Sequence, residues 1–223
     1  MSPKPPQIDR SAGGLAITTL GDVRVLGRLG EGGRSTVHRA SWHGRDVALK
    51  LYKASAVLRH ARKHPQHLAE FEYERNAAFW RAPGLARYVA EPLGFLATSG
   101  VAAFVQELLC GELYYFYYRR HGERVRPGLQ RHVERMVELY HAAGLYDVDL
   151  HSMNVMVVEA PDGEPIPKLF DFNLVPFHLH PPNPLVALLL RLGLLTPRAR
   201  DLRKLREFHD FRRVEARLLQ FYE

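Results

Sequence analysis

The chain has 223 residues, of which 46% are hydrophobic and 25% are charged, as is typical of a soluble globular protein with one large domain or two small lobes. The single cysteine, Cys110, excludes an internal disulfide, and no apolar run approaches the roughly 20 residues that span a bilayer. The formal net charge of +7 favours anionic partners such as phosphates, acidic lipids or nucleic acid.

Residues 1–20 are predicted to form a flexible leader. The stretch Met1–Gln7 is rich in proline and lacks the apolar core of a signal peptide, and glycines at positions 13 and 14 break any regular pattern. The lone cysteine fits a reducing compartment, so we predict a cytoplasmic protein. We expect the ordered chain to begin near Val23.

A glycine-rich turn joins the first two of three strands predicted within residues 23–52. Gly30, Gly32 and Gly33 lack side chains where a backbone can approach a phosphate group closely and expose its N–H groups. The third strand ends in Lys50, twenty residues after Gly30, where a fixed cation can meet phosphates held under the turn. A glycine-rich turn alone is found in many hairpins, and the lysine is what makes this one a candidate phosphate site.

A helix is predicted to begin after Pro65, with Phe71 and Ala78 on its buried stripe. Glu74 shares that face, and an acid on a buried face needs a cation. We therefore predict an ion pair between Glu74 and Lys50. The basic residues 54–64, which precede this helix, are predicted to form a solvated connector.

The middle of the chain is predicted to contain two strands within residues 88–106, a short connector and two helices. The aromatic cluster at residues 114–118 indicates either base stacking or a packed helix, and the packed helix is the preferred interpretation. The second long helix covers residues 127–143. It ends at Gly144, where a helix-ending glycine belongs.

Two acids and an amide lie next to predicted strands in the following part of the chain. Asp149 and Asn154 are five positions apart in a polar loop, and Asp171 comes just after an apolar run. The carboxylate of Asp149 can accept a proton from an attacking hydroxyl, while Asn154 and Asp171 offer hard oxygen ligands to Mg²⁺. These residue types in this order indicate a metal–nucleotide site.

The order of these parts resembles the protein-kinase-like fold. The matching elements are the glycine-rich turn, Val-Ala-Leu-Lys50, Glu74, Asp149-Leu-His-Ser-Met-Asn154 and Asp171-Phe172. The resemblance implies an α+β fold with two lobes. Residues 21–107 would form a small lobe of sheet plus one helix, and residues 108–223 a compact, shortened helical lobe with a basic C-terminal helix.

The resemblance also implies a role for each candidate residue. ATP would bind between the lobes, under a turn that includes Ser35 and Val37, and beside a hinge at Glu107 and Leu109. By the same resemblance, the remaining roles would fall to five residues: Lys50, oriented by Glu74, would hold the phosphates, Asn154 and Asp171 would bind Mg²⁺, and Asp149 would deprotonate the acceptor.

Three positions depart from the pattern of typical kinases. Ser35 stands at the third glycine of the turn, Asp147 replaces the histidine before the catalytic acid, and Asn173 follows Asp171-Phe172 in place of glycine. Only 52 residues follow Asp171, too few for the activation segment and peptide-binding helices of a regulated protein kinase.

The shortened form resembles two groups of atypical kinases. The lipopolysaccharide core sugar kinases (Kdo and heptose kinases) share the compact Asp-Leu-x-x-x-Asn loop and a short basic tail, which implies a saccharide-lipid acceptor. The RIO kinases share the serine in the turn and a non-glycine residue after Asp-Phe, which implies a serine/threonine protein kinase or an ATPase. A pseudokinase that only binds nucleotide or a partner is the non-enzyme alternative.

The C-terminal tail is predicted to contain two helices. The stretch Leu185–Leu195 is strongly apolar, and a core helix is the preferred interpretation over contact with a membrane surface. Residues 198–222 are predicted to form an amphipathic helix whose polar face carries an excess of arginine. That excess favours docking to anionic lipid at the inner membrane or to a phosphorylated saccharide, and no DNA binding is expected.

Overall fold

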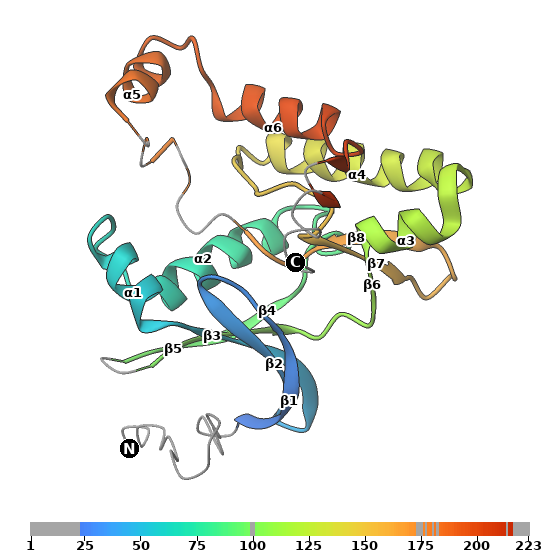
Figure 1. Ribbon diagram of the computed structural model, residues 1–223, viewed down its shortest axis with the longest axis horizontal. Helices are drawn as coiled ribbons and strands as arrows, with labels where there is room; N and C mark the ends of the chain where they lie inside the picture. The colour runs from blue at the N-terminus through green and yellow to red at the C-terminus, as the bar shows by residue number, and fades with distance from the viewer. Residues whose placement is uncertain are drawn as a thin grey trace. The chain divides into compact units, whose positions relative to one another are not determined.

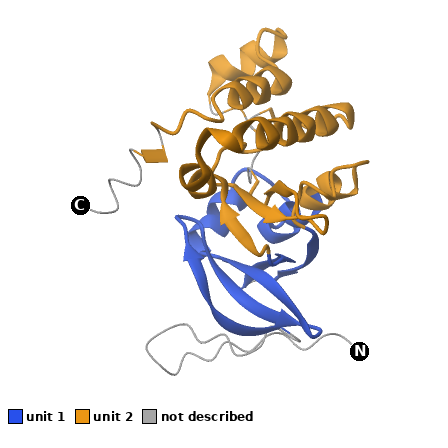
Figure 2. Cartoon of the chain, turned by 90° about the vertical axis from the view of Figure 1, so that its right-hand side faces the viewer, with its two compact units in different colours: residues 1–74, 91–108 blue, residues 75–90, 109–223 orange. Residues whose placement is uncertain are grey.

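The computed structural model describes residues 23–98, 101–172, 176, 178–179, 181, 183–212 and 214–215. The predicted leader and Asn173 lie outside these residues. The described chain divides into two compact units, drawn in blue and orange in Figure 2. Unit 1 comprises residues 1–74 and 91–108, and unit 2 comprises residues 75–90 and 109–223.

The helices and strands follow one another along the chain as labelled in Figure 1. The elements up to the end of unit 1 are β1 (Val23–Glu31), β2 (Ser35–Trp42), β3 (Arg45–Tyr52), α1 (Ala54–Ala61), α2 (Leu68–Arg81), β4 (Pro92–Ala97) and β5 (Ala102–Glu107). Those that follow are β6 (Gly111–Leu113), α3 (Tyr114–His121), the short 3₁₀ helix η1 (Gly122–Arg124), α4 (Arg126–Ala142), β7 (Val155–Glu159), β8 (Pro165–Leu169), α5 (Pro184–Arg191) and α6 (Pro197–Arg206).

Unit 1 is built on a five-stranded antiparallel sheet with the strand order β1-β2-β3-β5-β4. The turn from β2 to β3 has positive φ at His43 (49°) and Gly44 (78°), the backbone twist that suits a tight hairpin. Val47 and Leu49 alternate along β3 toward one face of the sheet and are fully buried there with Val105 of β5. The three predicted strands and their two turns are therefore confirmed.

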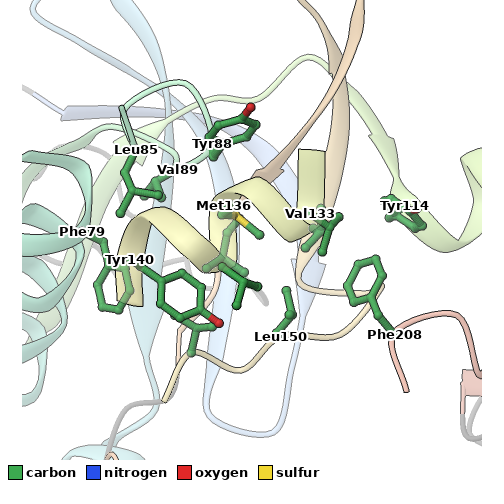
Figure 3. Packing of buried hydrophobic residues seen from close by; sticks show 14 of the residues in the cluster. Phe79, Leu85, Tyr88, Val89, Tyr114, Val133, Met136, Tyr140, Leu150 and Phe208 are labelled. Carbon is green, nitrogen blue, oxygen red and sulfur yellow. The ribbon is translucent and has the colours of Figure 1, made fainter. Parts of the chain in front are cut away.

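Unit 2 has its core around α4. Val133, Met136 and Tyr140 of this helix are fully buried, and Figure 3 shows them at the centre of the cluster. They recur at helical spacing, as the sequence predicts. Gly144 has a φ of +70°, so the predicted helix-ending glycine is confirmed. The predicted packing of the aromatic helix is also confirmed, because Tyr114 of α3 is fully buried in the same cluster.

A small antiparallel sheet of unit 2 has the order β6-β7-β8. Gly111 lies opposite Val158 at one end of this sheet. A Cβ atom at position 111 would come within 2.2 Å of the Val157 carbonyl oxygen, so the close approach of β6 to β7 requires glycine.

Two predictions for the tail are wrong. The apolar stretch forms α5, but none of its residues is buried, so it is not a core helix. The long amphipathic helix ends at Arg206, although Phe208 beyond it joins the core of unit 2. None of the described helices combines the length and the apolar composition that crossing a bilayer requires.

Candidate active site

Three of the site residues predicted in unit 1 lie in one row across the sheet. Gly30 of β1 is opposite Val37 of β2, and Val37 is opposite Lys50 of β3. Residues opposite each other in antiparallel strands point their side chains to the same face, so Val37 and Lys50 share a face. The side chain of Glu107 falls on the other face, with Val47, and its Oε2 accepts a hydrogen bond from the backbone N–H of Glu91 at 3.1 Å.

The glycine-rich turn connects β1 and β2 through residues 32–34. The backbone N–H of Gly32 donates to the carbonyl oxygen of Ser35 at 2.8 Å, and the Ser35 side chain is buried at the start of β2. A Cβ atom added at Gly30 or Gly33 would meet nothing within 4 Å, and neither has a positive φ. The packing of the chain itself therefore does not require glycine at these two positions.

Lys50 forms a buried ion pair with Glu72 of α2. The Nζ atom lies 2.8 Å from Oε1 of Glu72, and the two side chains are only 10% and 1% exposed. The second carboxylate oxygen, Oε2, accepts a hydrogen bond from the hydroxyl group of Tyr52. A buried carboxylate with both oxygens engaged holds the ammonium group of Lys50 in a fixed position.

The predicted pairing of Lys50 with Glu74 is wrong. Glu74 is exposed and accepts a hydrogen bond from Nε2 of Gln66 at 2.6 Å. The buried residues of α2 are Leu68, Ala69, Phe71, Glu72, Asn76, Ala77 and Phe79, whereas Ala78 is exposed. The prediction placed Phe71 correctly but took Ala78 as buried, and this selected Glu74 instead of Glu72. The spacing of Glu72 from Leu68 and Asn76, four residues each way, is the signal that would have found it.

The predicted base, Asp149, lies in a loop of unit 2 that is anchored on both sides. Val148 and Leu150 are buried in the core, so the side chain between them points the other way and is 37% exposed. Nδ2 of Asn154 donates to the backbone carbonyl oxygen of Asp149 at 3.0 Å. The Asp149 backbone is therefore held from within the loop as well as by its apolar neighbours.

Lys204 of α6 pairs directly with this base. Its Nζ lies 2.6 Å from Oδ1 of Asp149 and 3.4 Å from the carbonyl oxygen of Val148. Nε2 of His151 lies 3.8 Å from Oδ2 of Asp149. Burial raises the pKa of Asp149, but the charge and hydrogen bond of Lys204 outweigh it, so the net pKa lies below the ordinary value. The carboxylate is therefore ionised at neutral pH, as a base must be.

The two predicted metal ligands of unit 2 lie at the same end of the small sheet. Asn154 immediately precedes β7, Asp171 follows β8, and Val155 pairs with Leu169 in the antiparallel ladder. The backbone N–H of Phe170 donates to the carbonyl oxygen of Asn154 at 3.1 Å, which extends this pairing past the strands. The Nδ2 bond to Asp149 leaves Oδ1 of Asn154 as the oxygen available to a cation.

The loop before the base is supported by charged groups that the sequence analysis missed. Asp147 is fully buried with a φ of +63°, and its backbone N–H donates to Oδ2 of Asp201 at 2.8 Å. Its carboxylate pairs with Arg200 of α6. Nη2 of Arg75 donates to the carbonyl oxygens of Tyr146 and Asp147 at 2.9 and 2.8 Å. These contacts stand where typical kinases have a histidine and an arginine.

Burial also shifts the pKa values in this cluster. The pKa of Asp201 is raised to about 7, mainly because the carboxyl group is buried and also because Asp147 lies close by. Burial lowers the pKa of Arg75 to about 10, so this guanidinium group keeps its charge at neutral pH. Nε2 of His141 lies 3.4 Å from Oδ2 of Asp201, and burial lowers the pKa of that histidine, which keeps it neutral.

Leu109 lies in the short connector between β5 and β6 and is partly buried. The division between the two units falls next to it, after Leu108. No described side-chain contact assigns Leu109 to a ligand, so its hinge role stays a prediction. Among the described residues, no group of three or more His, Cys, Asp or Glu side chains is arranged to hold a metal ion.

Comparison with known proteins identifies the fold. No model of a protein family matches the sequence, and no curated protein matches it. Among solved structures, 1907 chains match, including the crystal structure of Rad53 1-466 in complex with AMP-PNP. The TM-score to that chain is 0.54 with 17% sequence identity, over 68% of this chain and 39% of the Rad53 chain.

At this level of identity the likeness shows the fold alone. The described chain has a mixed α+β, protein-kinase-like fold, with an N-terminal antiparallel sheet followed by helices. The fold class predicted from the sequence is therefore confirmed. The chain spans 39% of the length of the Rad53 chain, and neither the Kdo and heptose kinases nor the RIO kinases are singled out.

The partner of Lys50 can be tested by stability. Glu72→Ala should lower the free energy of unfolding by about 3–5 kcal/mol, because it leaves a buried ammonium group without its carboxylate. Glu74→Ala removes the same side chain from an exposed position of the same helix and should change stability by no more than about 0.5 kcal/mol. Urea denaturation followed by circular dichroism measures both. Equal losses, or a larger loss for Glu74→Ala, would contradict the assignment.

The raised pKa of Asp201 predicts a pH dependence. The folded protein keeps a proton on Asp201 up to about pH 7, whereas the unfolded chain releases it near the ordinary value of 3.8. This contribution to stability is therefore complete below pH 3.8 and is lost as the pH rises through about 7, by on the order of 4 kcal/mol at most.

Asp201→Asn keeps an oxygen that can accept the Asp147 N–H but cannot titrate. From pH 4 upward to about 7, the wild-type protein should lose stability relative to this variant. Urea denaturation of both proteins at several pH values measures the difference. A difference that is independent of pH would show that Asp201 does not titrate in this range.

Proposed function

We propose that the protein is an ATP- and Mg²⁺-dependent phosphotransferase that acts on a hydroxyl group. The observation that carries the proposal is the geometry of Asp149. It is an ionised carboxylate on a loop fixed by two core residues, with its backbone oxygen bonded to Asn154. A general base of this kind has to be positioned before the acceptor binds, and contacts within the chain itself fix this loop.

Lys50 is the proposed phosphate-binding cation. The buried carboxylate of Glu72 fixes its ammonium group at 2.8 Å, so Glu72 takes the orienting role expected of Glu74. The turn of Gly30, Gly32 and Gly33 is the proposed cover for the phosphates. Because the chain's own packing leaves room for a Cβ atom at Gly30 and Gly33, a closely approaching ligand is a physical reason for glycine there.

Asn154 and Asp171 are the proposed ligands for Mg²⁺. An amide oxygen and a carboxylate at one end of the β7–β8 pair fit this ion, which commonly takes one or two protein oxygens and fills its other positions with phosphate and water. When bound, Mg²⁺ would neutralise charge on the phosphate oxygens. Asp149 would orient the acceptor hydroxyl group and take its proton.

We propose a hydroxyl group of a lipopolysaccharide core sugar as the acceptor. The basic residues of α6 support this choice, because a phosphorylated saccharide on a lipid is an anionic partner. A RIO-like serine/threonine protein kinase or ATPase is the second candidate, and the buried Ser35 in the turn favours it. A nucleotide-binding pseudokinase is the third, favoured by the Lys204 ammonium that engages the carboxylate of Asp149.

Asp149→Asn tests the mechanism. The amide keeps the shape of the side chain but is not a base, so phosphate transfer should fall by at least ~100-fold while ATP binding stays within about twofold. Transfer is measured from γ-labelled ATP to purified core lipopolysaccharide and, separately, to protein substrates. Binding is measured by calorimetry. Glu138→Gln, an exposed acid on α4, is the matched control and should retain full activity.

Full activity of Asp149→Asn would contradict the proposed base. If the label appears in the protein substrates and not in the saccharide, the result would favour the RIO-like alternative. Binding of ATP without any transfer by the wild-type protein would favour the pseudokinase.

A further inference from the structure

The apolar helix α5 exposes its leucines. Leu185, Leu188 and Leu192, just after the helix, are 64%, 51% and 60% exposed, and Leu194 is 73% exposed. Single exposed leucines are common on protein surfaces, but four within ten residues are not. Their exposure needs an explanation that the core of unit 2 does not supply.

Three of these leucines form one face. Leu185, Leu188 and Leu192 are spaced by three and four residues, which places them within about a 60° sector of the helix. Both ends of the helix have residues that terminate it. The side chain of Asn183 caps it by accepting a hydrogen bond from the Val186 N–H at 2.9 Å, and Gly193 beyond it has a φ of +71°. The face is therefore presented by a regular, capped helix.

The exposed charged residues in the C-terminal stretch that contains this face are all positive. The exposed charged residues within 183–206, all of them arginines, are Arg191, Arg198, Arg203 and Arg206. The only acid in that stretch is Asp201, which is fully buried against the loop of Asp147. An apolar face that is followed in the chain by several exposed cations, with Glu207 as the first exposed acid, matches the apolar interior and the anionic head groups of a lipid surface.

The helix that follows α5 is anchored in unit 2. Thr196 caps α6 through a hydrogen bond from the Ala199 N–H at 3.1 Å, and α6 contacts α4. Figure 1 shows the short connection from α5 to α6 and the course of α6 along α4. Arg200 and Lys204 of α6 pair with Asp147 and Asp149. The leucine face of α5 is thus joined, through a short connection, to the helix α6 that contacts the candidate base.

We propose that the leucine face of α5 and the adjacent arginines form a docking surface for an anionic lipid bilayer. The leucines enter the boundary between head groups and acyl chains, and the arginines contact the lipid phosphates. A second copy of the chain fits less well, because a two-fold contact through this surface brings like-charged arginines together. The surface does not depend on the proposed phosphotransfer, and it would bring an enzyme of lipid-linked saccharides to its acceptor.

The test is flotation of the full chain with lipid vesicles. Vesicles of phosphatidylcholine mixed with an equal part of phosphatidylglycerol should carry the protein, whereas vesicles of phosphatidylcholine alone should carry at least ~10-fold less. The double variant Leu185→Ser/Leu188→Ser should lower the partition coefficient by roughly tenfold or more. Leu58→Ser is the matched control, because Leu58 of α1 is 63% exposed but lies outside the surface.

The arginines are tested in the same assay. Arg191→Gln/Arg198→Gln should lower binding by roughly 25-fold, since each of the two cations near an anionic surface contributes about a fivefold factor. Arg59→Gln/Arg62→Gln removes the same charge from an exposed part of unit 1 and should leave binding within about twofold. All substituted side chains are exposed, and circular dichroism melting curves should coincide with that of the wild type.

Three results would overturn the proposal. The first is equal binding to neutral and anionic vesicles. The second is vesicle binding that Leu185→Ser/Leu188→Ser leaves unchanged. The third is no vesicle binding together with a wild-type dimer, seen by analytical ultracentrifugation, that this leucine variant dissociates, because the occupant of the face is then a second copy.

Discussion

The backbone N–H of Asp147 donates to the carboxylate of Asp201, and the position of the loop that carries Asp149 depends on this buried contact. Asp147 adopts a left-handed backbone conformation, which is costly for a non-glycine residue unless its surroundings fix it. Arg75 binds two carbonyl oxygens of the loop, and Arg200 binds the carboxylate of Asp147. Each charged group in this buried cluster therefore has a partner of opposite charge or a backbone group to bind.

The contact between Asp147 and Asp201 shows that α6 supports the loop of Asp149. Arg200, Asp201 and Lys204 follow one another on α6 and reach the loop at Asp147 and Asp149. The first two hold the loop, and Lys204 keeps the carboxylate of Asp149 ionised. The same helix carries exposed arginines that follow the leucines of α5 in the chain. Support of the loop and the proposed lipid contact are thus located in one C-terminal segment.

Much of the fold could be predicted because local sequence patterns determine it. The three strands around the glycine-rich turn and the buried face of α4 each follow from alternation or helical spacing. The acid that pairs with Lys50 was predicted wrongly, because taking Ala78 as buried selects Glu74, two positions after Glu72. The contacts of Arg200 and Lys204 span more than fifty residues, and on sequence grounds they belong to a solvated basic face. The exposure of α5 could not be predicted, because an apolar helix has the same sequence pattern whether it packs in a core or lies on a surface.

Label transfer from γ-labelled ATP, with and without Mg²⁺, tests the central claim most directly. The wild-type protein should label core lipopolysaccharide only when Mg²⁺ is present, and Lys50→Met should lower the rate by at least ~100-fold because the cation proposed to bind the phosphates is lost. Lys63→Met, which removes an exposed lysine of the same unit, should retain the wild-type rate. A wild-type protein that binds ATP but labels neither saccharide nor protein, or a Lys50→Met variant with the wild-type rate, would contradict the account.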